Sequence, residues 1–558
     1  MISLLHETVR RQAERRPLST ALVMGDRALT YGQLDELSDR LAGLLVTAGC
    51  RPGDRIAMAV PKSPEAVVAM LASSKARCVY VPIDTASPAA RVAKIIRACE
   101  PRVLLVAEAT LELAGELVRE GATPADMLTG CLDAGEAVSS PVALSFGRCD
   151  WEAHDPAPPP TGASSTDPVH ILFTSGSTGT PKGVVITHAN VSAFIEWAVP
   201  YFGTGPSDRI SGHPPLHFDL STFDVYGTFM AGAELHLVPP GMNLSAHELA
   251  HYIRRSELTQ WFSVPSAMSY MARFDAIADG DFPSLRRVLW CGEVLPTAVL
   301  IHWMQRIPHA RFTNLYGPTE ATIASSYHTV PHCPTSPAES IPIGTACAGE
   351  EILVLDADLR PVPTGSIGDL YIAGVGLSPG YWQDEAKTRD AFISDPRHPE
   401  SGRRIYRTGD LARTDEGGLV WFVGRRDTQI KSRGYRIELG EVENALNAVP
   451  GLKECAVVGV ETGGFEGIAI CCAYATGKEV VGPAAVRKHL ATLVPQYMIP
   501  SHWLALEVLP KNVNGKIDRR LLKELFSSRV GPRPHAATGS RLSGPEGGPS
   551  GRPEEAGR

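Results

Sequence analysis

The chain has 558 residues, of which 44% are hydrophobic and 20% charged, and a formal net charge of −8. This length exceeds what one hydrophobic core usually supports, so two or three domains of an ordinary soluble globular protein are expected. The sequence has no long basic block and no apolar run near the eighteen or so residues of a membrane span, which argues against nucleic-acid and membrane partners.

The N-terminal residues 1–11 read as an amphipathic helix and lack the apolar core of a signal peptide. Eleven cysteines are scattered along the chain without metal-ligand spacing, most of them in apolar surroundings. Buried, reduced thiols in a cytoplasmic protein are therefore expected.

Residues 1–150 alternate helix-like and strand-like segments. Leucines recur at helical spacing between Leu34 and Val46, which predicts a helix with one apolar face. Three short apolar runs predict buried strands: 56–60, 79–83 and 103–106. This alternation favours a layered α/β domain.

The stretch 173–183 places five Ser or Thr hydroxyls, three glycines and one lysine between two apolar runs, which predicts a strand, a polar loop and another strand. Glycines let backbone N–H groups turn toward an anion, hydroxyls add donors and Lys182 adds positive charge, as in a polyphosphate cradle. A P-loop is excluded, because that motif needs Ser or Thr directly after Gly-Lys. A solvated surface loop is the plain alternative.

The rest of the chain changes character twice. Residues 184–350 again alternate strands and helices, whereas 351–423 are strand-rich with Gly and Pro turns. Residues 428–528 read as a separate small α+β unit. The Gly-, Pro-, Ser- and Arg-rich end of the chain cannot bury enough apolar surface to fold and is expected to be disordered.

Further motifs follow the loop in order: 314–320, 406–411, 424–431, 433–438 and 509–519. Together with 173–183, they resemble the adenylate-forming superfamily of acyl-CoA synthetases, luciferases and adenylation domains of nonribosomal peptide synthetases. Each motif alone is weak, but all of them in this order and spacing are specific. The resemblance covers about residues 10–527.

This resemblance implies an α/β fold with a large N-terminal multi-subdomain core that includes a β-rich part, plus a small mobile α+β C-terminal domain. The core, with the ATP and amino-acid sites, would span residues 1–424, and the hinge would be 425–427, with Asp427 as the hinge residue. The C-terminal lid domain would be 428–528, followed by a disordered tail, 529–558.

The resemblance also implies ATP and Mg²⁺ as cofactors. Thr319 is expected to touch the α-phosphate, Glu320 to bind Mg²⁺, and Lys516 to reach the junction of carboxylate and α-phosphate, so these three are the expected catalytic residues. Tyr316 is expected to stack on adenine. The expected phosphate loop is Thr174, Ser175, Gly176, Ser177, Thr178, Gly179 and Lys182.

Two more residues are expected at the nucleotide: Asp410, which would accept from both ribose hydroxyls, and Arg425, as a second contact. Taken singly, either could be an ordinary surface salt bridge. Because Lys182 and Lys516 would approach one reacting centre from different domains, the domains must close. Rotation at Asp427 after adenylation would withdraw Lys516 and open a path for a thiol.

The motif His217-Phe218-Asp219-Leu220-Ser221 indicates which class of carboxylic acid the chain would activate. In amino-acid-activating members of the family, the aspartate of Phe-Asp-x-Ser pairs with the substrate's α-ammonium, and Asp219 fits that position. A buried carboxylate without a cation is costly, so it favours a cationic substrate end. The alternative is a helix N-cap aspartate.

The other pocket positions follow by ungapped extension from neighbouring motifs, and they are apolar apart from one thiol: Leu220, Phe223, Phe262, Leu289, Cys291, Leu315, Ile323 and Ala324. A charged or amide side chain would find no partner there, so a small-to-medium apolar amino acid is expected. The lining is similar to that of freestanding proline-activating enzymes, which favours L-proline. Cysteine, alanine and other nonpolar amino acids remain open.

The expected activity is therefore an AMP-forming amino acid–carrier protein ligase of nonribosomal-peptide or pyrrole-type antibiotic biosynthesis. No carrier-attachment or condensation motif is found, so the acceptor is expected to be the phosphopantetheine thiol of a separate carrier protein. An acyl- or aryl-CoA ligase of the same fold is one alternative, against which Asp219 counts. A silent nucleotide-binding relative is another, against which Lys182, Glu320, Asp410 and Lys516 count together.

Overall fold

The computed structural model describes residues 4–135, 139–156, 162–176, 179–462, 467–477, 481–512 and 516–530, and the findings below concern this part of the chain. Two expected phosphate-loop residues, Ser177 and Thr178, lie outside it. So does the expected disordered tail from residue 531 onward. Residues 529 and 530, also assigned to that tail, instead belong to the last helix.

The phosphate loop belongs to a sheet with the strand order β18-β8-β7-β4-β3-β5-β6. Strands β3 to β7 run parallel, and β7 and β8 form an antiparallel hairpin, as the pattern of 173–183 predicted. The bounds are β3 (Arg55–Ala59), β4 (Val79–Pro82), β5 (Val103–Val106), β6 (Leu128–Cys131), β7 (Pro168–Thr174), β8 (Lys182–Thr187) and β18 (Gly380–Tyr381).

A second sheet has the order β15-β14-β13-β12-β11-β9-β10-β1-β2. Strands β9 and β11 to β13 run parallel, so their carboxyl ends meet at one edge, where ligands of open α/β sheets usually bind. The bounds are β1 (Thr20–Met24), β2 (Arg27–Thr30), β9 (Arg209–Gly212), β10 (Glu234–Leu237), β11 (Gln260–Ser263), β12 (Arg287–Trp290), β13 (Arg311–Tyr316), β14 (Ser326–Thr329) and β15 (Thr345–Ala346).

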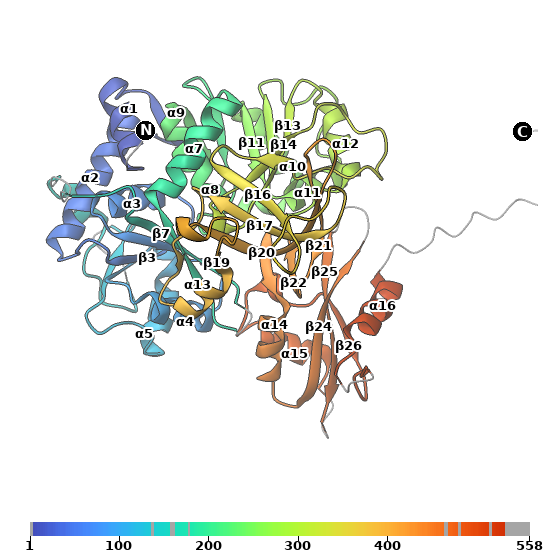
Figure 1. Cartoon of the computed structure of the whole chain (residues 1–558). Helices are drawn as coiled ribbons and strands as arrows, with labels where there is room; N and C mark the ends of the chain where they lie inside the picture. Colours follow the sequence, from blue (N-terminus) through green and yellow to red (C-terminus); the bar gives the residue numbers. More distant parts are fainter. Residues whose placement is uncertain are drawn as a thin grey trace, which may run out of the picture.

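Helices pack between and outside these two sheets (Figure 1). Helices α2, α3 and α7 share one apolar cluster with both sheets, α4 and α5 cover the other face of the first sheet, and α10 to α12 that of the second. Alternation along β3 serves both faces, because Ile56 and Met58 join one cluster and Ala57 and Ala59 the other.

The bounds of the helices in this part are α1 (Glu7–Arg15), α2 (Tyr31–Thr47), α3 (Pro64–Lys75), α4 (Ala89–Cys99), α5 (Leu111–Arg119), α6 (Arg148–Ala153), α7 (His188–Phe202), α8 (Leu220–Thr222), α9 (Thr228–Ala231), α10 (Ala246–Arg255), α11 (Pro265–Arg273) and α12 (Thr297–Arg306). The short helical turns η2 (Phe223–Gly227) and η4 (Thr319–Ala321) also bear on the site.

The predicted strands 56–60, 79–83 and 103–106 correspond to β3, β4 and β5, and the predicted leucine-rich helix is α2. Helix α2 begins after Thr30, whose hydroxyl accepts from the Gln33 N–H while the Gln33 side chain accepts from the Thr30 N–H, a capping box. The predicted N-terminal helix begins at Glu7, later than expected.

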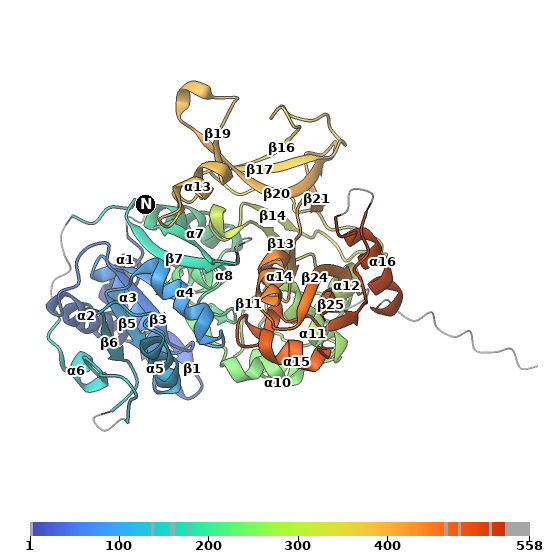
Figure 2. The ribbon, with the colours of Figure 1, turned by 90° about the horizontal axis from the view of Figure 1, so that it is seen from below.

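The predicted strand-rich stretch forms a third sheet, in which β16, β17, β20 and β19 are neighbours and β21 pairs with β20. Figure 2 shows this sheet standing apart from the helix-covered sheets. The bounds are β16 (Glu350–Leu355), β17 (Gly368–Gly374), β19 (Phe392–Ser394), β20 (Arg404–Thr414), β21 (Val420–Arg425) and the helix α13 (Glu385–Ala391).

The C-terminal elements form a smaller body beside this core (Figures 1 and 2). It opens with the hairpin β22–β23 and continues with a sheet of the order β24-β25-β26. The bounds are β22 (Gln429–Ser432), β23 (Tyr435–Glu438), α14 (Leu439–Asn447), β24 (Leu452–Glu461), β25 (Ile468–Thr476), α15 (Pro483–Leu490), β26 (His502–Ala505) and α16 (Arg519–Val530). A large α/β core with a smaller α+β part agrees with the predicted fold class.

No disulfide joins the eleven cysteines, of which Cys149 is exposed, Cys333 half-buried and the rest buried. None of the helices in the described ranges is both long and apolar enough to cross a bilayer.

Candidate active site

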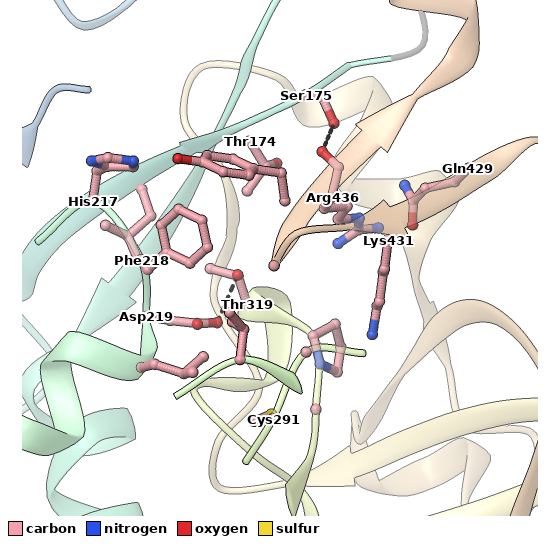
Figure 3. Close-up of a pocket in the computed structure, with 18 of the residues that line it drawn as sticks. Thr174, Ser175, His217, Phe218, Asp219, Cys291, Thr319, Gln429, Lys431 and Arg436 are labelled. Atoms are coloured by element: carbon pink, nitrogen blue, oxygen red, sulfur yellow. Dashed lines mark hydrogen bonds between the residues drawn. The ribbon is translucent and has the colours of Figure 1, made fainter. Parts of the chain in front are cut away.

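A pocket lies where the loop after β7 meets the carboxyl ends of β9, β12 and β13 (Figure 3). The core contributes Thr174, Ser175, Asp219, Cys291 and Thr319 to its wall. The hairpin β22–β23 of the C-terminal body closes the pocket from the other side, with Gln429, Lys431, Gly434, Tyr435 and Arg436.

Two glycines shape the phosphate loop. A Cβ on Gly176 would lie 2.1 Å from the Thr180 carbonyl oxygen, and Gly179 has a φ of +78°. Any other residue would therefore clash at the first position or be strained at the second. Gly176 can thus approach Thr180 closely, between Thr174 and Lys182, which end and begin the two strands.

Two described donors of this loop face the C-terminal body. Ser175 Oγ donates to the carbonyl oxygen of Arg436 at 2.6 Å, and the Gly176 N–H donates to Glu441 Oε2 at 3.3 Å. Thr174 Oγ1 and His217 Nε2 are buried at the pocket and have no hydrogen-bond partner among the described residues. Such orphaned polar atoms are unusual and fit a site that binds a polar ligand.

Glu320, on η4, is fully buried between two cations. Lys182 Nζ lies 3.1 Å from Glu320 Oε1, and Arg436 Nη1 lies 2.6 Å from Glu320 Oε2. Tyr381 donates to Oε1 at 2.8 Å. Burial alone would raise the pKa of Glu320, but the charges of Arg436 and Lys182 outweigh it and hold the pKa well below its usual range. The Glu320 side chain is therefore a carboxylate.

The donor set around Glu320 fits Mg²⁺ only if substrate phosphates supply further oxygen ligands. Among the described residues, no group of three or more His, Cys, Asp or Glu side chains could hold a metal. Mg²⁺, however, is commonly bound by one or two carboxylates together with substrate phosphates. Glu320, beside the phosphate loop, suits that arrangement.

The predicted nucleoside residues lie together. The Asp410 carboxylate, which is buried, accepts from the Tyr316 hydroxyl and pairs with Arg425. Arg425 also pairs with Asp427 at 2.7 Å, so the expected hinge residue is tied to the expected nucleotide site. Lys431 Nζ lies 5.4 Å from the centre of the Tyr316 ring, within cation–π range.

Asp219 follows β9 and stands immediately before α8. Its Oδ2 accepts from Thr319 Oγ1 at 2.7 Å (Figure 3), and its side chain makes no N-cap hydrogen bond to α8, which weakens the N-cap alternative. No ion pair joins Asp219 to a cation within the described ranges. Burial raises the pKa of Asp219 to about 6.

Below Asp219, all eight predicted pocket residues belong to one buried apolar cluster. Leu220 and Cys291 line the pocket itself, and the other six lie behind them: Phe223, Phe262, Leu289, Leu315, Ile323 and Ala324. The rings of Phe223 and Phe262 are 5.9 Å apart, edge to face. Phe194 of α7, which the sequence reasoning missed, packs 5.3 Å from Phe223. Aromatic rings therefore fill part of the cluster behind Leu220 and Cys291.

A strained turn sets one wall of this cluster. Thr322 and Ile323 are both β-branched, yet have φ values of +56° and +68°. Thr322 Oγ1 donates to the Gly376 carbonyl oxygen at 2.6 Å, and the Ala324 N–H donates to the Thr322 carbonyl oxygen at 2.8 Å. These bonds hold the turn that places Ile323 and Ala324 in the cluster.

Lys516 is not in this pocket. It is exposed, and its N–H donates to Asn512 Oδ1 at 3.1 Å within the C-terminal body. The structure thus brings Lys182, Glu320, Tyr316, Asp410 and Asp219 together, but not Lys516. Lys431 and Arg436 of the hairpin occupy the pocket instead (Figure 3).

Sequence reasoning missed three residues that contact the site across the two bodies: Arg436, Glu441 and Arg91. Arg91 of α4 pairs with Glu441, and both side chains are buried. The motif 433–438 contains Arg436, but its sequence does not indicate which residues the Arg436 side chain would contact. Sequence reasoning also missed Tyr381, whose hydroxyl accepts a hydrogen bond from Lys182 and donates one to Glu320.

A family model described as AMP-binding enzyme matches residues 9–382, and one described as AMP-binding enzyme C-terminal domain matches residues 441–516. The chain belongs to the AMP-binding enzyme family. The predicted membership of the adenylate-forming superfamily is therefore confirmed.

Curated relatives of this AMP-binding enzyme include L-proline--[L-prolyl-carrier protein] ligase of Streptomyces coelicolor, which is 34% identical over 93% of this chain and 95% of that protein. Malpinin synthetase of Mortierella alpina is 32% identical, also over 93% of this chain, but the chain spans only 6% of its length.

Solved structures of AMP-binding enzymes share the fold. The structure of IdnL1 has a TM-score of 0.73 and 27% identity and covers 91% of this chain and 98% of that chain. The Vibrio cholerae adenylation domain AlmE, in complex with glycyl-adenosine-5'-phosphate, has a TM-score of 0.81 over 95% of this chain and 98% of that chain. At 24% identity, the second likeness concerns the fold alone.

Proposed function

We propose that the chain is an amino acid–carrier protein ligase, which activates a small apolar amino acid with ATP and passes it to the phosphopantetheine thiol of a carrier protein. The observation that carries this proposal is Asp219. Its carboxylate lines the pocket above an apolar cluster and forms no ion pair among the described residues, although Lys431 lines the same pocket and attracts it at longer range. A substrate α-ammonium would supply the missing cation, as burial of a charge requires.

In the first half-reaction, a carboxylate oxygen of the amino acid attacks the α-phosphorus of ATP, and the bond to the β-phosphate breaks to release pyrophosphate. Ser175, Gly176 and Lys182 would hold the β- and γ-phosphates. Mg²⁺ bound by Glu320 and phosphate oxygens would supply further neutralising charge. Positioning two anions that repel each other and neutralising their charge are the main demands of such a step.

The remaining nucleotide contacts divide between base, ribose and α-phosphate. Tyr316 would stack on adenine, Asp410 would accept from the ribose hydroxyls, and Thr319 would touch the α-phosphate. Because Thr319 also donates to Asp219, one hydroxyl links the amino-acid site to the phosphate site. In the second half-reaction, the thiol sulfur of the carrier attacks the acyl carbon, and AMP leaves.

L-proline is the favoured substrate. The Streptomyces coelicolor relative that this chain resembles over nearly its full length acts, by its name, on L-proline. The apolar cluster that contains Leu220 and Cys291, with the rings of Phe223 and Phe262 in contact, suits a compact apolar ring. The secondary ammonium of proline can still donate two hydrogen bonds to Asp219.

The test is amino-acid-dependent exchange of pyrophosphate into ATP across the proteinogenic set, with loading of a carrier protein as second readout. We expect proline to give the highest exchange and coenzyme A to fail as acceptor. Tenfold faster exchange with alanine or cysteine would contradict the choice of proline. The absence of exchange with every amino acid would contradict the proposed activity.

A further inference from the structure

A buried lysine of the core binds the start of the segment that carries Asp219. Lys62 lies in the loop between β3 and α3. Its Nζ donates to three successive carbonyl oxygens: Gly212 at 2.7 Å, His213 at 2.7 Å and Pro214 at 3.4 Å. An ammonium group has three N–H donors, so it matches three acceptors. Gly212 ends β9, and the next two residues begin the segment that leads to Asp219.

Placing Lys62 here costs free energy. Burial lowers the pKa of Lys62 to about 7, against an opposing attraction from Asp224. Lys62 forms no ion pair with Asp224 in the described part of the chain, and burial raises the pKa of Asp224 well above its ordinary value. A buried lysine without a carboxylate partner needs other compensation, and the three carbonyl oxygens supply it.

Hydrogen bonds continue from this lysine toward Asp219. The Phe218 N–H donates to the Pro215 carbonyl oxygen at 3.0 Å, which closes a turn. The Phe218 carbonyl oxygen then accepts from Ser221 Oγ at 2.7 Å and from the Ser221 N–H at 3.1 Å. Asp219 lies between these two bonded residues. The carbonyls of 212–214 therefore anchor one end of a short hydrogen-bonded segment, and the pocket carboxylate lies at its other end.

Lys62 holds the segment, whereas the sheet holds the strand. The Gly212 carbonyl oxygen also accepts from the Val238 N–H at 3.2 Å. No second hydrogen bond within the described ranges reaches the carbonyl oxygens of His213 and Pro214. Loss of the lysine would therefore leave β9 in its sheet but release the two residues that follow it.

We propose that Lys62 is a positioning residue of the amino-acid site: by holding the carbonyls of 212–214, it fixes where Asp219 meets the substrate ammonium. This inference rests on the proposed function, because it takes the role of Asp219 from it. It adds a residue that does not touch the substrate and acts through the main chain. Small movements suffice, because misplacing a binding group by about 1 Å can cost on the order of a hundredfold in rate.

The difference between the two substrates tests this positioning. Lys62→Met keeps an unbranched apolar chain but removes the donors. In pyrophosphate exchange, its KM for the amino acid should rise at least tenfold, whereas its KM for ATP should stay within threefold. The expected ATP contacts lie on other elements, with Lys182 on β8, Tyr316 on β13 and Asp410 on β20. A smaller rise for the amino acid, or an equal rise for both substrates, overturns the inference.

Lys75→Met is the matched control. Lys75 is also buried and donates to the Asp35 carbonyl oxygen at 2.9 Å, but it ends α3 and pairs with Asp35 and Asp39. Its loss removes a buried cation without touching the segment that carries Asp219. The variant should unfold at a lower temperature, yet keep its KM for the amino acid within twofold. A rise equal to that of Lys62→Met would trace the effect to a weakened core and overturn the inference.

Hydrogen exchange gives a second readout that does not depend on activity. In Lys62→Met, peptides covering 213–222 should exchange at least fivefold faster than in the wild type, whereas those covering β12 should not change. Unchanged exchange in 213–222 overturns the inference. If Lys62→Met does not fold, Lys62→Arg replaces it, because a planar guanidinium cannot direct three N–H groups at three successive carbonyls. Its KM for the amino acid should rise at least threefold, and an unchanged KM overturns the inference.

Two failures are distinguishable. No pyrophosphate exchange with any amino acid in the wild type overturns the proposed function. Amino-acid-dependent exchange in the wild type, without a selective rise of the amino-acid KM in Lys62→Met, overturns only this inference and leaves the proposed function standing.

Discussion

At the scale of single residues, the ionised Asp219 carboxylate lowers the stability of the free protein, although it is the proposed partner of the substrate ammonium. Burial raises its pKa to about 6, so the folded state holds a proton more tightly than the unfolded chain between pH 4 and 6. The sign follows: stability falls as pH rises through that window, and the ionised carboxylate is a cost at neutral pH. The substrate ammonium is what would offset that cost.

Asp219→Asn should therefore stabilise the free protein at pH 7.5, by about 1 to 3 kcal/mol for a shift of some two pKa units in a side chain that faces the pocket. Thermal unfolding at pH 5 and pH 7.5 measures this, and the gain should shrink at the lower pH. A variant less stable than the wild type at pH 7.5 would contradict the argument.

The same variant should lose amino-acid-dependent exchange, by at least a hundredfold, because its amide cannot pair with an ammonium. In the wild type, KM for the amino acid should rise about tenfold per pH unit below pH 6. Asp224→Asn is the matched control. Asp224 is buried five residues further on, outside the pocket, and its substitution should leave that pH profile unchanged.

At the scale of elements, the hairpin β22–β23 docks through its turn. Gly434 has a φ of +81°, and a Cβ there would lie 2.6 Å from Val264 Cγ1 of the core. Any side chain at this position therefore pushes the hairpin out of the pocket. Adenylation would use a different placement of the C-terminal body, with Lys516 at the reacting centre.

Gly434→Ala should accordingly keep pyrophosphate exchange within about threefold of the wild type, yet cut loading of the carrier protein at least tenfold. Val264→Ala in the same chain should restore part of the loading, because it removes the clashing methyl groups. Gly418→Ala controls for backbone strain, since Gly418 has a φ of +80° and open space around it. Equal loss of both half-reactions in Gly434→Ala would argue for misfolding.

Elements of the core could be predicted because their signals are local. The period of the leucines predicted α2, and the apolar runs flanking 173–183 predicted β7 and β8. The docking of Arg436 on Glu320 could not be predicted, because these residues are 116 positions apart and meet only when two bodies take one particular orientation. No periodicity or spacing in the sequence encodes that orientation.

At the scale of the whole molecule, the site is divided between two bodies. The core contributes Lys182, Glu320, Asp410 and Asp219, and the C-terminal body contributes Arg436. In the arrangement described here Arg436 is at the site and Lys516 is exposed. If Lys516 reaches the reacting centre, as the resemblance to adenylate-forming enzymes implies, we propose that the C-terminal body turns between the two half-reactions.

Lys516→Ala should abolish adenylate formation, which pyrophosphate exchange measures, while transfer from a preformed aminoacyl adenylate to the carrier stays within about threefold. Lys511→Ala is the matched control: this lysine lies on the same loop but pairs with Glu454 inside the C-terminal body. It should leave both half-reactions intact. Equal loss of both in Lys516→Ala would refute the division of labour.

The Glu441 carboxylate, which accepts a hydrogen bond from Gly176 of the phosphate loop, has a consequence for the cell. If pyrophosphate and Glu441 exclude each other, the share of enzyme ready to meet its carrier follows the surrounding pyrophosphate concentration. An inorganic pyrophosphatase would then act on this enzyme twice, once by making adenylation irreversible and once by freeing the loop for Glu441. The rate of product formation would then depend on how fast the cell hydrolyses pyrophosphate.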